Sequence, residues 1–85
     1  DAVLNIHPNP TSNDISFDYY TKTNDNLRVE IKSYTGNSVL KTEYFIDEGK
    51  NNIAVPINNL PNGIYILEVS SEKSKTTSHH KIIKN

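Results

Sequence analysis

Alternation of apolar and charged residues with a period of two is the feature that most constrains how this chain can fold. In Leu27–Lys32 every second side chain is apolar, and each side chain between them is charged. Successive side chains of a β-strand point to opposite faces of its sheet, so this pattern predicts a strand with one buried and one solvated face. A similar alternation recurs in Ile15–Tyr19 and Ile53–Ile57. Because no segment shows a sustained apolar repeat at helical spacing, the chain is expected to be all-β.

Two segments indicate their own place in a sheet. Pro56 lacks a backbone N–H group, so its strand is expected at a sheet edge or at a bulge. The segment Ile64–Val69 has apolar residues on both faces, which is typical of a central strand. Alternation places Tyr65, Leu67 and Val69 on one face of that strand, where they are expected to anchor the core.

Turn-forming sequences separate the predicted strands. They are Pro8-Asn9-Pro10, Asn24-Asp25-Asn26, Gly36-Asn37, Glu48-Gly49 and Pro61-Asn62-Gly63. Gly36 and Gly63 are expected to adopt positive φ, and Pro61 fixes its own φ just before Asn62. Further strands are expected near Val3–Ile6, Val39–Ile46 and His79–Lys84. About seven short antiparallel strands predict an immunoglobulin-like β-sandwich.

The composition excludes several classes of protein. A net charge of -1 gives no overall basic field, which argues against nucleic-acid binding. The longest apolar run, Ile64–Leu67, is far shorter than the roughly 20 residues of a membrane-spanning helix. The chain has no cysteine, so it can form neither a disulfide framework nor a thiolate metal site. It begins at Asp1 without a signal peptide, and we expect it to be a piece of a longer protein.

No group of residues predicts catalysis or metal binding. His79 and His80 are adjacent, so on a strand they point to opposite faces and cannot bind one ion together. The acidic segments around Asp25 and Asp47 lack the spacing of a calcium loop and are expected to be solvated turns. Neither a Gly-x-Ser-x-Gly motif nor a Gly-rich phosphate loop is present. We therefore expect no enzymatic activity, no metal and no cofactor.

Carbohydrate binding is an alternative, because many β-sandwich modules bind sugars. Tyr20 and Tyr44 are the side chains that would present aromatic rings to a glycan. The chain has no tryptophan, and aromatic residues on strands more often pack within a sheet. A carbohydrate-binding or adhesive accessory module of a secreted enzyme is therefore the second interpretation.

Positive charge gathers near the C-terminus. Residues 72–85 contain four lysines and one glutamate, a local charge of +3, which leaves -4 on the rest of a chain with net charge -1. One interpretation is a final edge strand whose lysines prevent aggregation. The other is a strand that a partner recognises by its charge.

Several sequence motifs follow one another in a specific order along nearly the whole chain. They are Ile6-His7-Pro8-Asn9-Pro10, Ile15-Ser16-Phe17, Val29-Glu30-Ile31 with Tyr34-Thr35-Gly36, Leu60-Pro61-Asn62-Gly63-Ile64-Tyr65-Ile66-Leu67-Glu68-Val69, and Lys81-Ile82-Ile83-Lys84. In this order the chain resembles the type A C-terminal sorting domain of type IX secretion cargo. His7 departs from the family pattern, which usually has a tyrosine before Pro-Asn-Pro, whereas Pro8 and Pro10 match it.

The resemblance implies a secretion signal that follows a cargo protein. Residues 1–85 are then one C-terminal sorting domain, excised from a longer secreted chain. The resemblance implies transit through the periplasm, recognition by the type IX outer-membrane translocon and its shuttle components, and delivery of the cargo to the cell surface or the medium. It also implies that a sortase-like peptidase removes the domain near or before Asp1 and that the cargo is anchored. Neither nucleic acid nor a small-molecule substrate is expected as a partner, and the domain is expected to be monomeric.

The C-terminal motif contains the predicted recognition residues, Lys81, Ile82, Ile83 and Lys84. On a terminal strand their backbone and charges are expected to be available to a partner, by edge pairing or through an acidic surface. The other positions that match the family belong to motif turns and to the central strand. They are Pro8, Asn9, Pro10, Gly36, Pro61, Asn62, Gly63, Tyr65, Leu67 and Val69.

Overall fold

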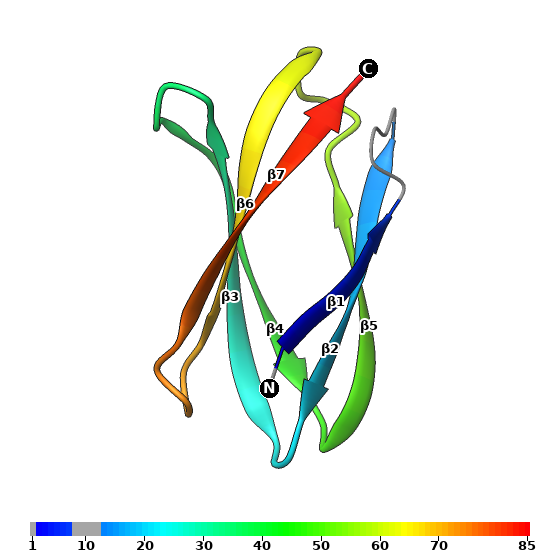
Figure 1. Cartoon of the computed structure of the whole chain (residues 1–85), viewed down its shortest axis with the longest axis vertical. Coiled ribbons are helices and arrows are strands. Elements are labelled where there is room, and N and C mark those ends of the chain that lie inside the picture. Colours follow the sequence, from blue (N-terminus) through cyan, green and yellow to red (C-terminus); the bar gives the residue numbers. More distant parts are fainter. Residues whose placement is uncertain (1, 8–12) are drawn as a thin grey trace.

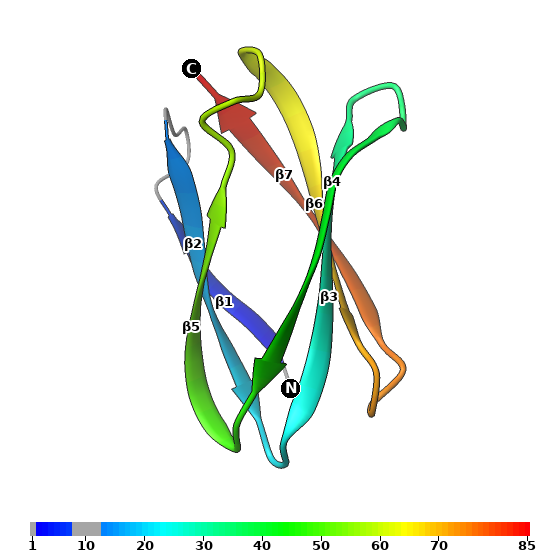
Figure 2. The same ribbon diagram turned by 180° about the vertical axis from the view of Figure 1, so that it is seen from behind.

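The described part of the chain forms two β-sheets that face one another (Figures 1 and 2). The computed structural model describes residues 2–7 and 13–85. Its strands are β1 (Ala2–His7), β2 (Asp14–Thr21), β3 (Asp25–Ser33), β4 (Ser38–Ile46), β5 (Gly49–Pro56), β6 (Gly63–Ser71) and β7 (Thr77–Lys84). One sheet has the order β1-β2-β5 and the other β4-β3-β6-β7, and every pair is antiparallel. The predicted all-β sandwich is confirmed.

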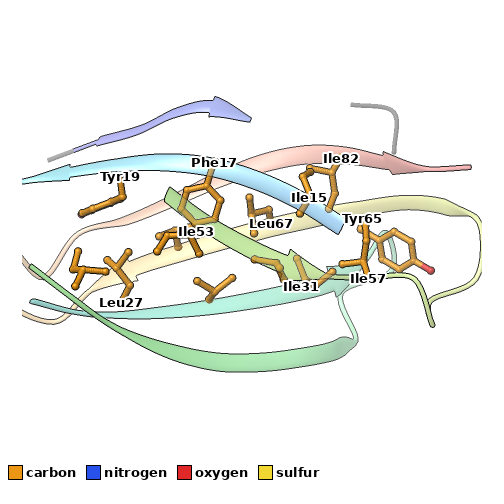
Figure 3. Close-up of a cluster of buried hydrophobic side chains, with 14 residues drawn as sticks. Ile15, Phe17, Tyr19, Leu27, Ile31, Ile53, Ile57, Tyr65, Leu67 and Ile82 are labelled. Carbon is orange, nitrogen blue, oxygen red and sulfur yellow. The ribbon is translucent and has the colours of Figure 1, made fainter. Parts of the chain in front are cut away.

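The core lies between the inner faces of the two sheets (Figure 3). Its largest fully buried side chain is Phe17 of β2, and both sheets contribute aliphatic side chains to the same cluster. On β2, β3 and β6 buried residues alternate with more exposed ones, as the period of two predicts. The predicted inner-face residues Tyr65, Leu67 and Val69 are all buried.

The edge position of Pro56 is confirmed. It ends β5, one of the two edge strands of the three-stranded sheet, where a residue without an N–H group does not interrupt the hydrogen bonds of a central strand. Beside this edge the Tyr44 hydroxyl of β4 donates a 3.0 Å hydrogen bond to the backbone oxygen of Ala54 in β5. This contact links the two sheets on the side of the sandwich where β4 and β5 are connected.

The central position of β6 is also confirmed, but its outer face is not covered. β6 lies between β3 and β7, and its register places Ile64 opposite Ile83 and Ile66 opposite Lys81. Ile64 is 40% exposed and Ile66 is half-buried. These apolar side chains are therefore partly accessible, because no element packs on the outer face of this sheet in the described residues.

The glycine turns have the predicted geometry. Gly36 has φ of 99°, and its N–H group donates to the Ser33 oxygen at 2.9 Å. Gly63, with φ of 157°, is close to the extended region, so its conformation excludes other residues less strictly than that of Gly36. The predicted turn Pro8-Asn9-Pro10 lies outside the described residues.

Asp18 connects the strands of the three-stranded sheet on its outer face. Its carboxylate accepts hydrogen bonds from the side-chain amides of Asn5 in β1, at 3.1 Å, and Asn52 in β5, at 3.2 Å. These hydrogen bonds hold the pKa of Asp18 below its ordinary value, with a further contribution from the Lys50 ammonium group at 3.8 Å. Asn5 has φ of 56° within the irregular register between Leu4 and His7. The contact therefore attaches β1 where its ladder is interrupted.

A buried aspartate organises the turn that leads into β7. The sequence predicts a solvated turn at Asn24-Asp25-Asn26, but Asp25 is buried and begins β3. Its carboxylate accepts hydrogen bonds from the Ser71 hydroxyl and from the N–H groups of Asn26 (2.7 Å) and Lys73 (3.1 Å). Ser71 ends β6, so these bonds tie the start of β3 to the β6–β7 turn. Burial raises the pKa of Asp25, but these hydrogen bonds outweigh it and the pKa lies below the ordinary 3.8.

A tyrosine hydrogen bond fixes the other turn of β6. The Tyr65 hydroxyl donates to the backbone oxygen of Pro61 at 2.5 Å, four residues earlier. This contact is a tyrosine corner, a feature of immunoglobulin-like sandwiches in which the tyrosine near the start of this strand bonds back to the preceding turn. It gives a physical reason for the spacing of Pro61 and Tyr65 in the motif.

Replacing the hydroxyl of this corner should destabilise the domain. Tyr65→Phe should lower the free energy of unfolding by about 1 kcal/mol, the usual contribution of one such hydrogen bond. The melting temperature should fall by about 4–8 °C, since the domain is small. Tyr20→Phe is the control, because the Tyr20 ring is exposed and no hydrogen bond of its hydroxyl is found within the described residues. Equal melting temperatures for the two variants, measured by circular dichroism, would contradict a role for the corner.

Asp25 should make the stability dependent on pH. A carboxyl group with a lower pKa in the folded than in the unfolded state contributes stability above the unfolded pKa, here 3.8, and loses it as the pH falls through the folded pKa. Asp25→Asn should therefore lower the unfolding free energy near neutral pH by roughly 1–3 kcal/mol and flatten the decline toward acid. Thermal melts between about pH 7 and about pH 2 test this. The exposed Asp47→Asn is the control, and the expectation fails if both variants keep the wild-type pH dependence.

Candidate recognition surface

β7 is the last strand of the four-stranded sheet and contains all four predicted recognition residues. Its side chains alternate between the inner and outer faces of the sandwich. Lys81 is exposed and Ile83 is half-buried on the outer face, whereas Ile82 and Lys84 are buried on the inner face. The structure therefore does not bring the four residues together on one surface.

The two inward residues hold β7 in place. Ile82 is part of the hydrophobic core and is paired with Tyr65 in the register of β6 and β7. Lys84 is only 7% exposed, and its Nζ donates a long hydrogen bond of 3.5 Å to Oδ1 of Asn62. The expectation that the charge of Lys84 is exposed was wrong. Its hydrocarbon chain lies along the interior while the ammonium group reaches the Pro61-Asn62-Gly63 turn.

The two outward residues adjoin apolar side chains of β6. Ile83 lies opposite Ile64, and Lys81 lies opposite Ile66. We call Ile64, Ile66 and Ile83 the outer isoleucine patch. The sequence pattern indicated Ile64 and Ile66 only as residues of a central strand, so this patch was not predicted. The signal that could have found it is the alternation itself, which places Ile64 and Ile66 on the face opposite the core residue Tyr65.

Charged side chains border the patch toward the middle of the sheet. Lys32, opposite Ile66 on β3, forms an ion pair with Glu68 at 3.1 Å, and this glutamate raises the pKa of Lys32. His79 Nε2 lies 3.1 Å from the same Glu68 oxygen. The outer face of the β6–β7 pair thus has an apolar end and an adjoining network of ionisable groups.

The histidines are placed as the alternation predicts. His79 is on the outer face, whereas His80 is half-buried and its Nε2 lies 3.0 Å from the Ser78 hydroxyl. Burial lowers the pKa of His80, and the neighbouring His79 adds to this effect. Within residues 2–7 and 13–85 no three His, Cys, Asp or Glu side chains are grouped so that they could hold a metal ion.

The two tyrosines of the carbohydrate alternative do not form a shared surface. Tyr20 is on β2 of the three-stranded sheet, where its ring is exposed. Tyr44 is on β4 of the other sheet, packs against the core and donates its hydroxyl hydrogen to Ala54. The described residues also contain no helix of the length and hydrophobicity that a membrane span requires.

Comparison with family models identifies the kind of domain to which this surface belongs. Residues 5–85 match the model of the secretion system C-terminal sorting domain. The chain belongs to this family. It is therefore a type IX secretion C-terminal sorting signal, which interacts with that secretion system and belongs to a protein secreted through the outer membrane. Domains of the family are generally non-catalytic. Neither the curated proteins nor the solved structures give a match.

The different environments of the two lysines predict different effects on stability. Lys84→Glu places a carboxylate at a buried position beside Oδ1 of Asn62 and should lower the unfolding free energy by roughly 1–3 kcal/mol. Lys81→Glu changes an exposed side chain and should alter it by no more than about 0.5 kcal/mol. Thermal melts of the two single variants measure the difference. If Lys84→Glu melts at the wild-type temperature, its burial does not contribute to folding.

Proposed function

We propose that the type IX translocon recognises the outer face of the β6–β7 pair, through Lys81 and the outer isoleucine patch. The observation that supports this is the alternation of side chains along β7. Lys81 and Ile83 lie on the outer face, where a partner can reach them. Ile82 and Lys84 are buried on the inner face and stabilise the fold instead. A partner surface that is apolar at its centre and acidic beside it would complement the patch and Lys81. The excess of positive charge in residues 72–85 favours such a partner.

We further propose the route that the sequence motifs imply. The domain follows a cargo protein, crosses the periplasm as a monomer, meets shuttle components and the translocon, and directs the cargo to the cell surface or the medium. A sortase-like peptidase then cuts near or before Asp1 and anchors the cargo. The start of β1 and the end of β7 lie toward opposite ends of the sandwich (Figure 1). A cargo attached before β1 would therefore leave the recognition surface accessible.

A reporter assay tests this proposal. The domain is fused behind a periplasmic reporter in a host with the type IX system, and surface delivery is measured by the protease sensitivity of the reporter on intact cells. The wild-type domain should deliver the reporter. Lys81→Glu combined with Ile83→Ser should reduce delivery by about tenfold or more, which corresponds to a loss of about 1.4 kcal/mol of binding free energy.

The matched control lies at the opposite edge of the same sheet face. Val39 and Lys41 of β4 are an exposed apolar and an exposed basic residue with the same spacing. Lys41→Glu combined with Val39→Ser should leave delivery unchanged, and both double variants should be folded at the assay temperature. Equal delivery by the two folded double variants would show that this part of β7 is not the recognition surface.

A further inference from the structure

A second surface, at the other end of the outer face of the four-stranded sheet, has a different chemistry. Phe45 of β4 is 89% exposed and lies opposite Asn26 of β3. A single exposed apolar residue is common on protein surfaces and is not by itself a site. The groups around the ring are what distinguish this position.

Two carboxylates converge beside Phe45. The Asn26 side-chain amide donates hydrogen bonds to Glu43 Oε2 at 2.6 Å and to Glu72 Oε2 at 3.2 Å. Glu43 comes from β4, and Glu72 comes from the turn after β6. A neutral amide can orient two carboxylates, but it does not compensate their like charges.

No cation of the described residues is paired with these carboxylates. Neither Glu43 nor Glu72 belongs to the ion pairs found there, which involve Asp18 and Glu68. Arg28 stands opposite Glu43 in the register but forms no ion pair with it. The nearby ammonium groups are directed elsewhere: that of Lys73 to the Thr23 hydroxyl, and that of Lys75 to the Glu72 backbone oxygen.

The same amide has an unused acceptor. Oδ1 of Asn26 is buried and has no hydrogen-bond partner within the described part of the chain. Buried polar atoms are usually paired, so this atom requires an explanation. A shallow hollow lies at this position, and its lining residues are Asn24, Asp25, Asn26, Phe45, Glu72 and Lys73. The surface thus combines hydrogen-bond acceptors, two carboxylates that form no ion pair within the described residues, and an accessible aromatic ring.

We propose that this surface, which we call the Phe45 surface, binds an arginine side chain of an extended segment of a partner protein. A guanidinium group has several donors in a fixed plane and can bond to two carboxylates while its face stacks on an aromatic ring. A lysine ammonium group would compensate the charge but would lack the planar stacking. The Phe45 surface and the outer isoleucine patch are at opposite ends of the sheet face, so this inference is independent of the recognition proposed for β7.

Binding of a defined peptide to the whole chain tests this inference. The probe is the capped pentapeptide Ser-Arg-Ser-Arg-Ser, and the matched controls replace both arginines by lysine or by glutamate. Nuclear magnetic resonance should show saturable shifts of the Asn26 side-chain amide with the arginine peptide, weaker binding of the lysine peptide and none of the glutamate peptide. Phe45→Ser, and separately Glu43→Gln with Glu72→Gln, should each weaken binding by about tenfold.

The control variant is Tyr34→Ser, which removes another exposed ring at 75% exposure in the distant β3–β4 turn. It should bind the arginine peptide like the wild type, and all variants should melt near the wild-type temperature because their changed residues are exposed. The inference is overturned if the arginine peptide produces no saturable shift, if the glutamate peptide binds equally well, or if Phe45→Ser and Tyr34→Ser bind alike. It is also overturned if sedimentation shows self-association that Phe45→Ser abolishes, because a second copy then occupies this surface.

Discussion

Contact between the inner faces of the two sheets is the interaction on which the rest of this structure depends. The chain has 85 residues, of which 34% are hydrophobic, and it has no cysteine to form a disulfide. A domain of this size buries a smaller fraction of its surface than a larger one does, so few core positions can be lost. Both sheets contribute to one core cluster, which includes Phe17 of β2 and Ile82 of the final strand. Formation of the core is therefore coupled to the docking of β7 onto the sheet.

Hydrogen bonds support the fold where the apolar core ends. The Tyr65 hydroxyl holds the turn before β6, and the Asp25 carboxylate holds the turn after it. Because β6 pairs with β7 along its length, these two contacts fix both ends of the surface that Lys81 and Ile83 present. The burial of Asp25 is tolerated because each of its oxygens accepts a hydrogen bond.

The period of two and the turn-forming sequences were sufficient to predict the strands and the inner-face residues, and Pro56 indicated the edge position of β5. It could not predict which of two adjacent apolar residues points inward, and Ile82 next to Ile83 is such a case. Phe45 next to Ile46 is another, with Phe45 outward and Ile46 in the core. Contacts between residues distant in sequence could not be predicted from local patterns either. Asp25 and Ser71 are 46 residues apart, and Lys84 contacts Asn62 only in the folded chain. Polar residues in turns are usually solvated, so the burial of Asp25 depends on a partner that the local sequence does not reveal.

The outer isoleucine patch is assembled from two strands and is not a continuous stretch of sequence. Ile64 and Ile66 belong to β6, and they meet Ile83 only when β6 and β7 are paired in register. A receptor that binds this composite epitope distinguishes conformations, because an unfolded chain offers the same residues without their juxtaposition. Such a receptor would bind the C-terminal motif only in a folded domain. Secretion of the cargo across the outer membrane would then depend on the conformation of the domain as well as on its sequence.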